Sequence, residues 1–491
     1  MARALMLQGT GSDVGKTVLV AGLCRLLANR GLRVRPFKPQ NMSNNAAVSR
    51  DPVPGEMGRA QWLQAKAARV PPSVHMNPVL LKPQSETGSQ IIVQGKVRGT
   101  ARGRDYQRLK PQLLSAVLES YRIVSADADI VLVEGAGSPA EINLRPGDIA
   151  NMGFATAADV PVVLVGDIDR GGVIASLVGT HAILDATDRA MIAGYIINKF
   201  RGDVSLFDDG LLAITRHTGW PSLGVVPWLQ AAGRLPAEDS VALERMSRAN
   251  EKGALKVVVP LFGRVANFDD LDPLAAEPAV DLIYLRPGEP WPLDATLVVL
   301  PGSKSTIADL RSARDAGFDL ALRAHRARGG HVVGLCGGYQ MLGRSVRDPL
   351  LSEGDECEIE GIGLLDIDTV MAPEKTVRNV RARSFTFDAD LEGYEIHLGQ
   401  TTGPDCERPP LTIEGRPDGA MSADGRVFGT YLHGLFGNDA FRAEYLRKLG
   451  AETAPASHDQ QVETALDAIA ERLADVIDVD ALLAIAASRS S

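Results

Sequence analysis

The stretch Gly9-Thr-Gly-Ser-Asp-Val-Gly-Lys-Thr17 decides the fold of the first half of this chain. It follows an apolar run at Ala4–Leu7 and precedes an apolar helical pattern that continues to Asn29, so it occupies the turn of a strand–loop–helix unit. Glycines let consecutive backbone N–H groups curl around phosphate oxygens, and the dipole at the helix N-terminus favours a bound anion. The stretch therefore predicts a P-loop that binds the phosphates of a nucleotide.

Four residues of this loop have expected roles. Gly11 and Gly15 let the backbone approach the phosphates, Lys16 neutralises the terminal phosphates, and the Thr17 hydroxyl ligates Mg²⁺. Five residues separate Gly9 from Gly15, one more than in the standard motif. The alternative is a glycine-rich turn without a nucleotide, but the Gly-Lys-Thr ending and its context favour the phosphate site.

Further apolar runs in the first half predict a parallel sheet with helices on both faces. These runs are rich in β-branched residues and alternate with helical patterns, and they lie at Ala4–Leu7, Leu32–Phe37, Ile130–Val133, Val162–Val165 and Met191–Ile197. The predicted fold class of this half is therefore a doubly wound α/β domain.

Polar residues that follow these strands are candidates for the nucleotide site, because the carboxyl ends of parallel strands border the ligand crevice. Glu134 is expected to bind Mg²⁺, with a helix-capping carboxylate as the alternative. Asp167 and Asp169 could face the phosphates or cap a turn. Asn198 stands where related P-loop folds hold the base, and Arg201 replaces the Asp with which GTPases pair guanine. We therefore expect ATP rather than GTP.

The second half contains another α/β pattern, with a candidate nucleophile at a sharp turn. Its strands are predicted at Lys256–Pro260, Thr296–Leu300, His331–Leu335 and Val427–Tyr431. Cys336 directly follows the third of these, and small residues flank it before a helix begins. This is the geometry of a nucleophile elbow, and the adjacent helix N-terminus favours the reactive thiolate.

Partners for this nucleophile come from other strand ends. Gly337 and the segment that contains Gly302 could donate backbone N–H groups to an oxyanion. His433 follows the last predicted strand and is the candidate base, although a lone histidine is usually structural. The pattern predicts that the pair cleaves glutamine through a thioester and releases ammonia.

Composition limits the function classes. The chain has 491 residues, 45% of them apolar, and a formal net charge of −9, which gives no electrostatic reason to expect a nucleic-acid partner. No segment approaches the roughly 20 apolar residues of a membrane span, and the N-terminus does not read as a signal peptide. Four scattered cysteines do not form a disulfide framework or a zinc site. We expect a cytoplasmic enzyme, whose oligomeric state the sequence leaves open.

Four segments are predicted along the chain. The P-loop domain occupies 1–235, a polar linker 236–253, the second α/β domain 254–445 and a helical tail 446–491. The tail carries an apolar helical face formed by Val462, Leu466, Ile469, Leu473 and Val476. We expect this face to pack on the second domain.

The longer P-loop resembles that of dethiobiotin synthetase and its relatives, and the second half resembles class I glutamine amidotransferases. From about residue 3 to residue 437, the whole chain is similar to the cobyric acid synthase family. The stretches that carry this resemblance are Phe37–Ser43, Met76–Pro83, Val133–Asn143, Asp148–Gly153, Gly166–Gly172, Ile196–Asp203, Leu300–Thr306 and Tyr394–Gly399.

The resemblance implies ATP- and glutamine-dependent amidation of four peripheral carboxylates (b, d, e and g) of adenosylcobyrinic acid a,c-diamide, which gives adenosylcobyric acid. By the same resemblance, Cys336 is the nucleophile with His433 as its base, and Lys38 lies on the corrinoid side. The chemistry also allows Lys38 to steady the transferring phosphoryl group, with a surface lysine after a strand as the alternative. Gln40, Asn41 and Asp148 are expected to line the corrinoid side. The partners would then be small molecules, L-glutamine and a corrinoid polycarboxylate.

One departure from the amidotransferase pattern matters. The broad class I pattern places Glu two residues after the histidine, whereas this chain has Leu435 there. The residue that orients His433 is therefore open, and Glu395 and His397 are candidates only because their motif is nearby.

Two alternative functions would also explain some of these motifs. A sister amidoligase, such as cobyrinic acid a,c-diamide synthase or a cell-wall precursor amidotransferase, would use the same machinery. A partitioning-type nucleotide-switch ATPase with an inert C-terminal module would explain the P-loop but not Cys336 and His433.

Overall fold

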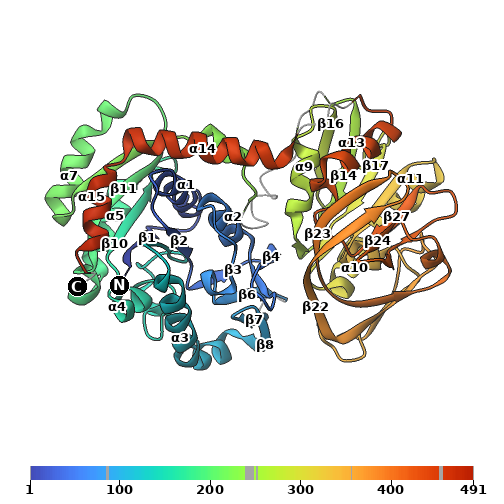
Figure 1. Ribbon diagram of the computed structural model, residues 1–491, viewed down its shortest axis with the longest axis horizontal. Coiled ribbons are helices and arrows are strands. Elements are labelled where there is room, and N and C mark those ends of the chain that lie inside the picture. Colours follow the sequence, from blue (N-terminus) through green and yellow to red (C-terminus); the bar gives the residue numbers. More distant parts are fainter. Residues whose placement is uncertain are drawn as a thin grey trace.

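The computed structural model describes residues 2–84, 88–237, 248–249, 253–354, 356–452 and 457–489, and it places them in two lobes (Figure 1). The predicted linker at 236–253 lies mostly outside the described residues. Among those residues, the structure contains no helix that combines the length and the apolar character needed to cross a bilayer.

The first lobe is built on a six-stranded parallel sheet in the order β12-β11-β10-β1-β9-β2. Its strands are β1 (Arg3–Gly9), β2 (Val34–Phe37), β9 (Ile130–Glu134), β10 (Val162–Asp167), β11 (Ile192–Phe200) and β12 (Ser222–Pro227). The five strands predicted in this half are all confirmed. Because β1 lies between β9 and β10, the P-loop, Glu134 and Asp167 all emerge at the carboxyl edge of three adjacent strands.

Helices cover both faces of this sheet, as expected for a buried parallel sheet. They are α1 (Lys16–Asn29), α2 (Arg59–Ala67), α3 (Gly103–Ala126), α4 (Met152–Ala158), α5 (Val173–Ile183), α6 (Ala186–Arg189) and α7 (Asp208–Thr218). Two small sheets extend the lobe toward the second one: β3 (Gln40–Met42), β6 (Val79–Pro83), β7 (Gly88–Val93) and β8 (Lys96–Arg102), and the pair β4 (Ala46–Val48) and β5 (Glu56–Gly58). The sequence analysis did not predict these short strands.

The second lobe has a seven-stranded sheet in the order β13-β16-β14-β17-β19-β27-β26. Its strands are β13 (Arg248–Ala249), β14 (Leu255–Pro260), β16 (Val280–Leu285), β17 (Leu297–Leu300), β19 (His331–Leu335), β26 (Ala420–Met421) and β27 (Val427–Thr430). The four strands predicted here are confirmed within one residue at each end. The central strands are parallel, so the elbow after β19 and the histidine after β27 lie at one edge.

Other elements surround this sheet. The helices are α9 (Asp272–Ala275), α10 (Thr306–Asp315), α11 (Phe318–Ala327), α12 (Gly337–Met341) and α13 (Asp439–Lys448), and the short antiparallel pair is β15 (Val265–Ala266) with β18 (Gly302–Ser303). A further sheet contains β20 (Ser345–Arg347), β21 (Glu358–Glu360), β22 (Asp368–Ser384), β23 (Ala389–Thr402), β24 (Leu411–Ile413) and β25 (Arg416–Asp418). The long β22–β23 hairpin was not predicted, because its many charged residues obscure the alternation of a strand.

The expected packing of the tail on the second domain is wrong. The tail forms α14 (His458–Val476) and α15 (Val479–Ala487), and α14 runs from the second lobe across to the first (Figure 1). Its apolar face packs on α1, where a Cβ on Gly22 would come within 2.5 Å of Ile469 and 2.6 Å of Leu473. The buried Arg25 of α1 also pairs with Glu463 at 2.6 Å. Periodicity predicted the apolar face, but it carries no information about which surface covers that face.

Candidate functional site

The phosphate loop has the geometry that its glycines predicted. Gly15 is in the left-handed region, with φ 92°, directly before α1. A Cβ at Gly9 would come within 2.8 Å of the Gly11 carbonyl oxygen and 2.9 Å of the Lys16 ammonium. The Lys16 ammonium itself curls back and donates to the carbonyl oxygen of Gly137, at 3.2 Å. The loop therefore places a cation at its centre, beside the turn that follows β9.

Glu134 connects the loop to two other segments of the first lobe. Its Oε1 accepts hydrogen bonds from the Thr17 hydroxyl and the Lys38 ammonium, both at 2.8 Å, and its Oε2 accepts from the Gln64 amide at 2.6 Å. The carboxylate is 1% exposed. Sequence reasoning singled out Thr17, Lys38 and Glu134 but missed Gln64, which lies in helix α2 without a motif of its own.

These donors fit a magnesium ion. Octahedral Mg²⁺ binds oxygen at about 2.0–2.1 Å, so two adjacent ligand oxygens lie roughly 2.9 Å apart. The Thr17 Oγ1 and the Glu134 Oε1 are 2.8 Å apart. Lys38 shares that carboxylate oxygen, so it lies where it can contact both the carboxylate and a phosphate oxygen.

Asn198 has a part in the loop itself. Its side-chain amide donates to the carbonyl oxygen of Val14 at 2.8 Å, and a Cβ on Gly15 would come within 2.4 Å of that amide nitrogen. The neighbouring Lys199 pairs with Asp167 at 2.8 Å. The end of β11 therefore supports the P-loop backbone, and the expected contact of Asn198 with the base stays a prediction.

A pocket adjoins the phosphate loop at Gly137. Gln40, Lys110, Arg145 and Asp148 are among the residues that line it. The Asp148 carboxylate accepts backbone N–H groups at the start of α4, including that of Gly153 at 2.8 Å, so it also fixes the turn. The lining thus carries two basic and two acidic side chains, since Glu141 also belongs to it, and Arg145 is paired with Asp188 at 2.6 Å.

Of the predicted substrate residues, Gln40 lies at the pocket and Asn41 does not. The hydroxyl of Tyr106 donates to the side-chain oxygen of Gln40 within the pocket wall. Asn41 is buried, and its amide donates to the Gln61 side chain at 3.0 Å. Alternating side chains on β3 explain this difference, because Gln40 and Asn41 point to opposite faces.

Cys336 lies at a nucleophile elbow between β19 and α12. It has φ 50° and ψ −109°, a strained conformation that is typical of functional sites. The turn is crowded, since a Cβ on Gly338 would come within 2.2 Å of the Leu300 carbonyl oxygen and one on Gly337 within 2.8 Å of the Ser303 backbone nitrogen. The thiol reaches the Ile396 carbonyl oxygen at 3.5 Å. The small residues that sequence analysis noted are therefore required by the turn.

The oxyanion candidates lie on either side of this thiol. Gly337 is the first residue of α12, and the N–H groups of a first helical turn lack partners within their helix. A Cβ on Gly302 would lie 3.4 Å from Cε1 of His433, which places the start of β18 beside the base. The structure thus brings Gly302, Cys336 and His433 to one pocket, with Gly337 directly after the thiol, and the oxyanion role itself stays a prediction.

His433 is oriented by a residue that sequence analysis missed. Its Nδ1 lies 2.7 Å from Oδ2 of Asp270, and the Gly434 N–H donates to the other oxygen of that carboxylate at 2.6 Å. Asp270 is in the short 3₁₀ helix Phe268–Leu271, far from His433 in sequence and without a recognisable motif. Glu395, a candidate for this role, pairs with Arg378 at 2.5 Å. His397, the other candidate, stacks on Tyr431 with ring centroids 3.9 Å apart.

The environment of His433 favours the imidazolium form. Burial alone would lower its pKa, but the charges of Asp270 and Cys336 raise the pKa to about 10. Tyr394 stacks on the ring with centroids 5.1 Å apart and an interplanar angle of 16°. A protonated imidazole held beside a sulfur can stabilise a thiolate and later give its proton to a leaving amine.

The two lobes meet beside this thiol. Asn267 donates to the Ala46 carbonyl oxygen at 3.1 Å and to the Tyr394 hydroxyl at 3.0 Å. Arg59 of α2 pairs with Asp269 at 3.0 Å. The residues that surround the catalytic histidine are therefore in direct contact with the first lobe.

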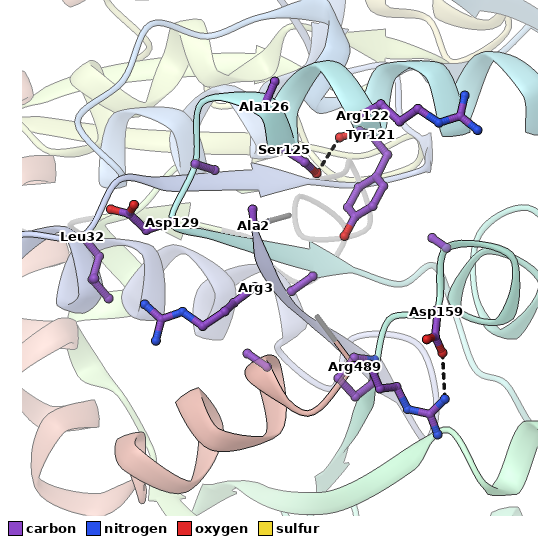
Figure 2. A pocket seen from close by; sticks show the side chains of 15 residues that line it. Ala2, Arg3, Leu32, Tyr121, Arg122, Ser125, Ala126, Asp129, Asp159 and Arg489 are labelled. Carbon is purple, nitrogen blue, oxygen red and sulfur yellow. Dashed lines mark hydrogen bonds and ion pairs between the residues drawn. The ribbon is translucent and has the colours of Figure 1, made fainter. Parts of the chain in front are cut away.

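A cavity larger than those at the P-loop and the thiol lies elsewhere, at the amino-terminal edge of the first sheet (Figure 2). Arg3, Tyr121, Asp129 and Asp159 are among its lining residues, and Arg489 of the tail pairs with Asp159 at 2.7 Å. Ligands of doubly wound sheets bind at the opposite, carboxyl edge, where the P-loop is. Size alone therefore does not identify the active site of this chain.

Comparisons with known proteins match each half of the chain to a family of known domains. The model of the family described as CobQ/CobB/MinD/ParA nucleotide binding domain matches residues 5–242. That of the CobB/CobQ-like glutamine amidotransferase domain matches residues 256–441.

Curated relatives match almost the whole chain. The cobyric acid synthase of Sinorhizobium fredii is 71% identical over 478 residues, which covers 97% of this chain and 98% of the relative. The proteins of the same name from Allorhizobium ampelinum and Rhizobium meliloti are 70% and 68% identical, with the same coverage.

Proposed function

The chain belongs to the cobyric acid synthase family, and from this premise we propose that it is a glutamine-hydrolysing, ATP-dependent amidoligase of cobalamin biosynthesis. Its reaction is the amidation of the b, d, e and g carboxylates of adenosylcobyrinic acid a,c-diamide, which yields adenosylcobyric acid. One observation carries this proposal: a Cys336–His433–Asp270 arrangement and a P-loop with Lys38 and Glu134 occur in two lobes that contact each other beside the thiol.

The second lobe is proposed to release ammonia from glutamine. The Cys336 thiolate attacks the carboxamide carbon, and backbone N–H groups near Gly302 and Gly337 stabilise the oxyanion. His433 then protonates the departing ammonia, which leaves a thioester on the sulfur. Water hydrolyses this thioester to glutamate, with His433 as the base, and Asp270 holds the imidazole in position throughout.

The first lobe is proposed to activate the corrinoid carboxylate. A carboxylate oxygen attacks the γ-phosphorus of ATP and displaces ADP, and ammonia then displaces phosphate from the acyl phosphate. Lys16 and Lys38 are placed to stabilise the charge on the transferred phosphoryl group. Thr17 and Glu134 would hold Mg²⁺, which when bound neutralises phosphate charge.

The corrinoid is proposed to bind at the pocket beside Gly137. This pocket adjoins Gly137, whose carbonyl oxygen accepts from Lys16 of the P-loop, and the Lys110 ammonium in its lining can bind a substrate carboxylate. Gln40 and Asp148 line the same pocket and can bond to amide and carboxyl groups of the substrate.

Mass spectrometry tests this function directly. Purified protein is incubated with ATP, Mg²⁺, glutamine and adenosylcobyrinic acid a,c-diamide, while glutamate and ADP are measured in parallel. We expect four successive products, each with one more carboxyl oxygen replaced by NH than the product before it. One glutamate should be released for each amidation. An unchanged corrinoid in this assay, together with amidation at the a and c positions when cobyrinic acid is supplied in its place, would indicate the sister amidoligase. ATP hydrolysis without glutamate release would indicate a nucleotide switch.

A further inference from the structure

Two buried lysines and one half-buried lysine line the pocket that contains Cys336. Lys82 belongs to β6 of the first lobe, Lys304 follows β18, and Lys375 lies in β22. Lys82 is 2% exposed and Lys304 is 4% exposed. The glutaminase mechanism uses none of these side chains, yet burying two ammonium groups beside a third that is half-buried has a large desolvation cost.

Two carboxylates compensate these charges only in part. Glu56 pairs with Lys82 at 3.0 Å and with Lys375 at 2.5 Å. Glu353 lies near Lys304, and its carboxylate also accepts the backbone N–H of Thr306 at 2.9 Å. The three lysines of the lining therefore have two carboxylate neighbours, Glu353 in the lining itself and Glu56 behind it.

The pKa values of two of these lysines are consistent with an excess of positive charge in the pocket. Burial lowers the pKa of Lys304 to about 8, although Glu353 opposes the shift. Burial also lowers the pKa of Lys82, against the Glu56 carboxylate and the Cys336 thiolate, which raise it. A group whose charged form is disfavoured by burial is stabilised when an anion joins it.

We propose that Lys82, Lys304 and Lys375 bind the α-carboxylate of glutamine, so that the first lobe completes the glutamine site of the second. This inference rests on the proposed glutaminase function. Glutamine has one group that reacts at Cys336 and one permanent anion a few bonds away, and this pocket provides a thiol and an excess of cations. Aspartate and glutamate lack the carboxamide that reacts with the thiol, and the α-amide of glutamine lacks the anion that the lysines would bind.

Lys82 is held in this pocket by the contact between the lobes. The adjacent Gln84 accepts a hydrogen bond from the Ser305 hydroxyl at 3.1 Å and donates to the Ser352 carbonyl oxygen at 3.2 Å. Ile396, whose carbonyl contacts the thiol, packs in one apolar cluster with Ala46 and Leu80 of the first lobe. Glutamine binding therefore depends on the docked arrangement of the lobes.

The test compares glutamine with its α-amide, L-glutaminamide, which keeps the reacting carboxamide but lacks the anion. Hydrolysis of both compounds is measured for the full-length protein and for Lys82→Met, Lys304→Met and the control Lys256→Met, whose lysine pairs with Asp294 on the surface. Ammonium-dependent amidation is measured in each variant to show that the protein is folded.

We expect the unaltered protein to prefer glutamine strongly over the α-amide. In Lys82→Met, KM for glutamine should rise about tenfold or more, which is the usual effect of losing one charge-assisted hydrogen bond. The preference for glutamine over L-glutaminamide should fall by the same factor. Lys256→Met should leave both unchanged. A purely structural role of the lysines would lower activity toward both compounds equally.

Unchanged KM and unchanged preference in Lys82→Met would overturn the inference. If Lys82→Met also loses ammonium-dependent amidation, Lys304→Met in the other lobe is used in its place. Its KM for glutamine and its preference for glutamine over the α-amide then test the inference. Absence of glutamine hydrolysis in the unaltered protein would instead contradict the proposed function itself.

Discussion

Nδ1 of His433 lies 2.7 Å from Oδ2 of Asp270, although 163 residues separate them in the chain. The neighbouring Asp269 pairs with Arg59 of the first lobe at 3.0 Å. The 3₁₀ helix that carries both aspartates therefore connects His433 to the first lobe. This arrangement replaces the glutamate that the broad amidotransferase pattern places after the histidine.

Asp270→Asn should lower glutamine hydrolysis by about 100-fold or more, because the amide does not fix the tautomer or stabilise the imidazolium. Amidation from added ammonium salts should remain. The control is Asp366→Asn, whose carboxylate pairs with Arg344 on the surface. Initial rates of glutamate release for the two variants make the comparison, and equal rates would exclude Asp270 from the mechanism.

The pH profile of glutamine hydrolysis should lose activity only at high pH. Burial lowers the pKa of His433 but Asp270 and Cys336 raise it from 6.5 to about 10. A raised pKa keeps the imidazolium fully formed below about 6.5, and the proton is lost as the pH rises through about 10. In Asp270→Asn the alkaline limb should move to lower pH. A limb at the same pH in both proteins would show that Asp270 does not hold this proton.

Cys336→Ala should abolish glutamine-dependent amidation and retain amidation from ammonium salts, because the phosphate site lies in the other lobe. Cys357→Ala, which changes an exposed cysteine, is the matched control. Product formation with each nitrogen source is measured by mass spectrometry. Loss of both activities in a folded Cys336→Ala protein would contradict a separate ammonia-producing site.

Lys16→Ala should stop amidation with either nitrogen source, because the P-loop then lacks the cation that neutralises the terminal phosphates. Glutamine hydrolysis by the second lobe should remain measurable. Lys96→Ala, in the exposed strand β8, is the control. ADP release in the presence of the corrinoid reports the effect, and unimpaired turnover would remove the P-loop from the mechanism.

Gly22→Val should destabilise the first lobe by about 1–3 kcal/mol, the usual effect of overpacking a filled core. Even a Cβ at this position would come within 2.6 Å of both Ile469 and Leu473 on α14. Gly179→Ala is the control, since Gly179 of α5 has open space around it. Thermal unfolding of both variants is compared, and equal stability would contradict the packing of α14 on α1.

The sequence by itself determined the phosphate loop, the elbow at Cys336 and the parallel strands of both lobes. The P-loop and the elbow at Cys336 are local motifs, in which glycines and a strand–turn–helix pattern fix the backbone over about ten residues. Parallel strands follow from continuous apolar runs between helices, and the polar residues at their ends could be identified for the same reason. The sequence thus predicted Lys16 and Thr17 at the start of a helix, and Glu134, Cys336 and His433 at strand ends, where the structure has them.

Only the tertiary structure decided which distant residues meet. Asp270, Gln64 and Lys82 have no local motif, and each acts through a partner from another element: His433, Glu134 and the thiol pocket. The same reason explains the wrong expectation for α14, whose periodicity fixes an apolar face but not the surface that covers it. Local sequence specifies backbone conformation, whereas long-range pairing depends on how the completed elements pack.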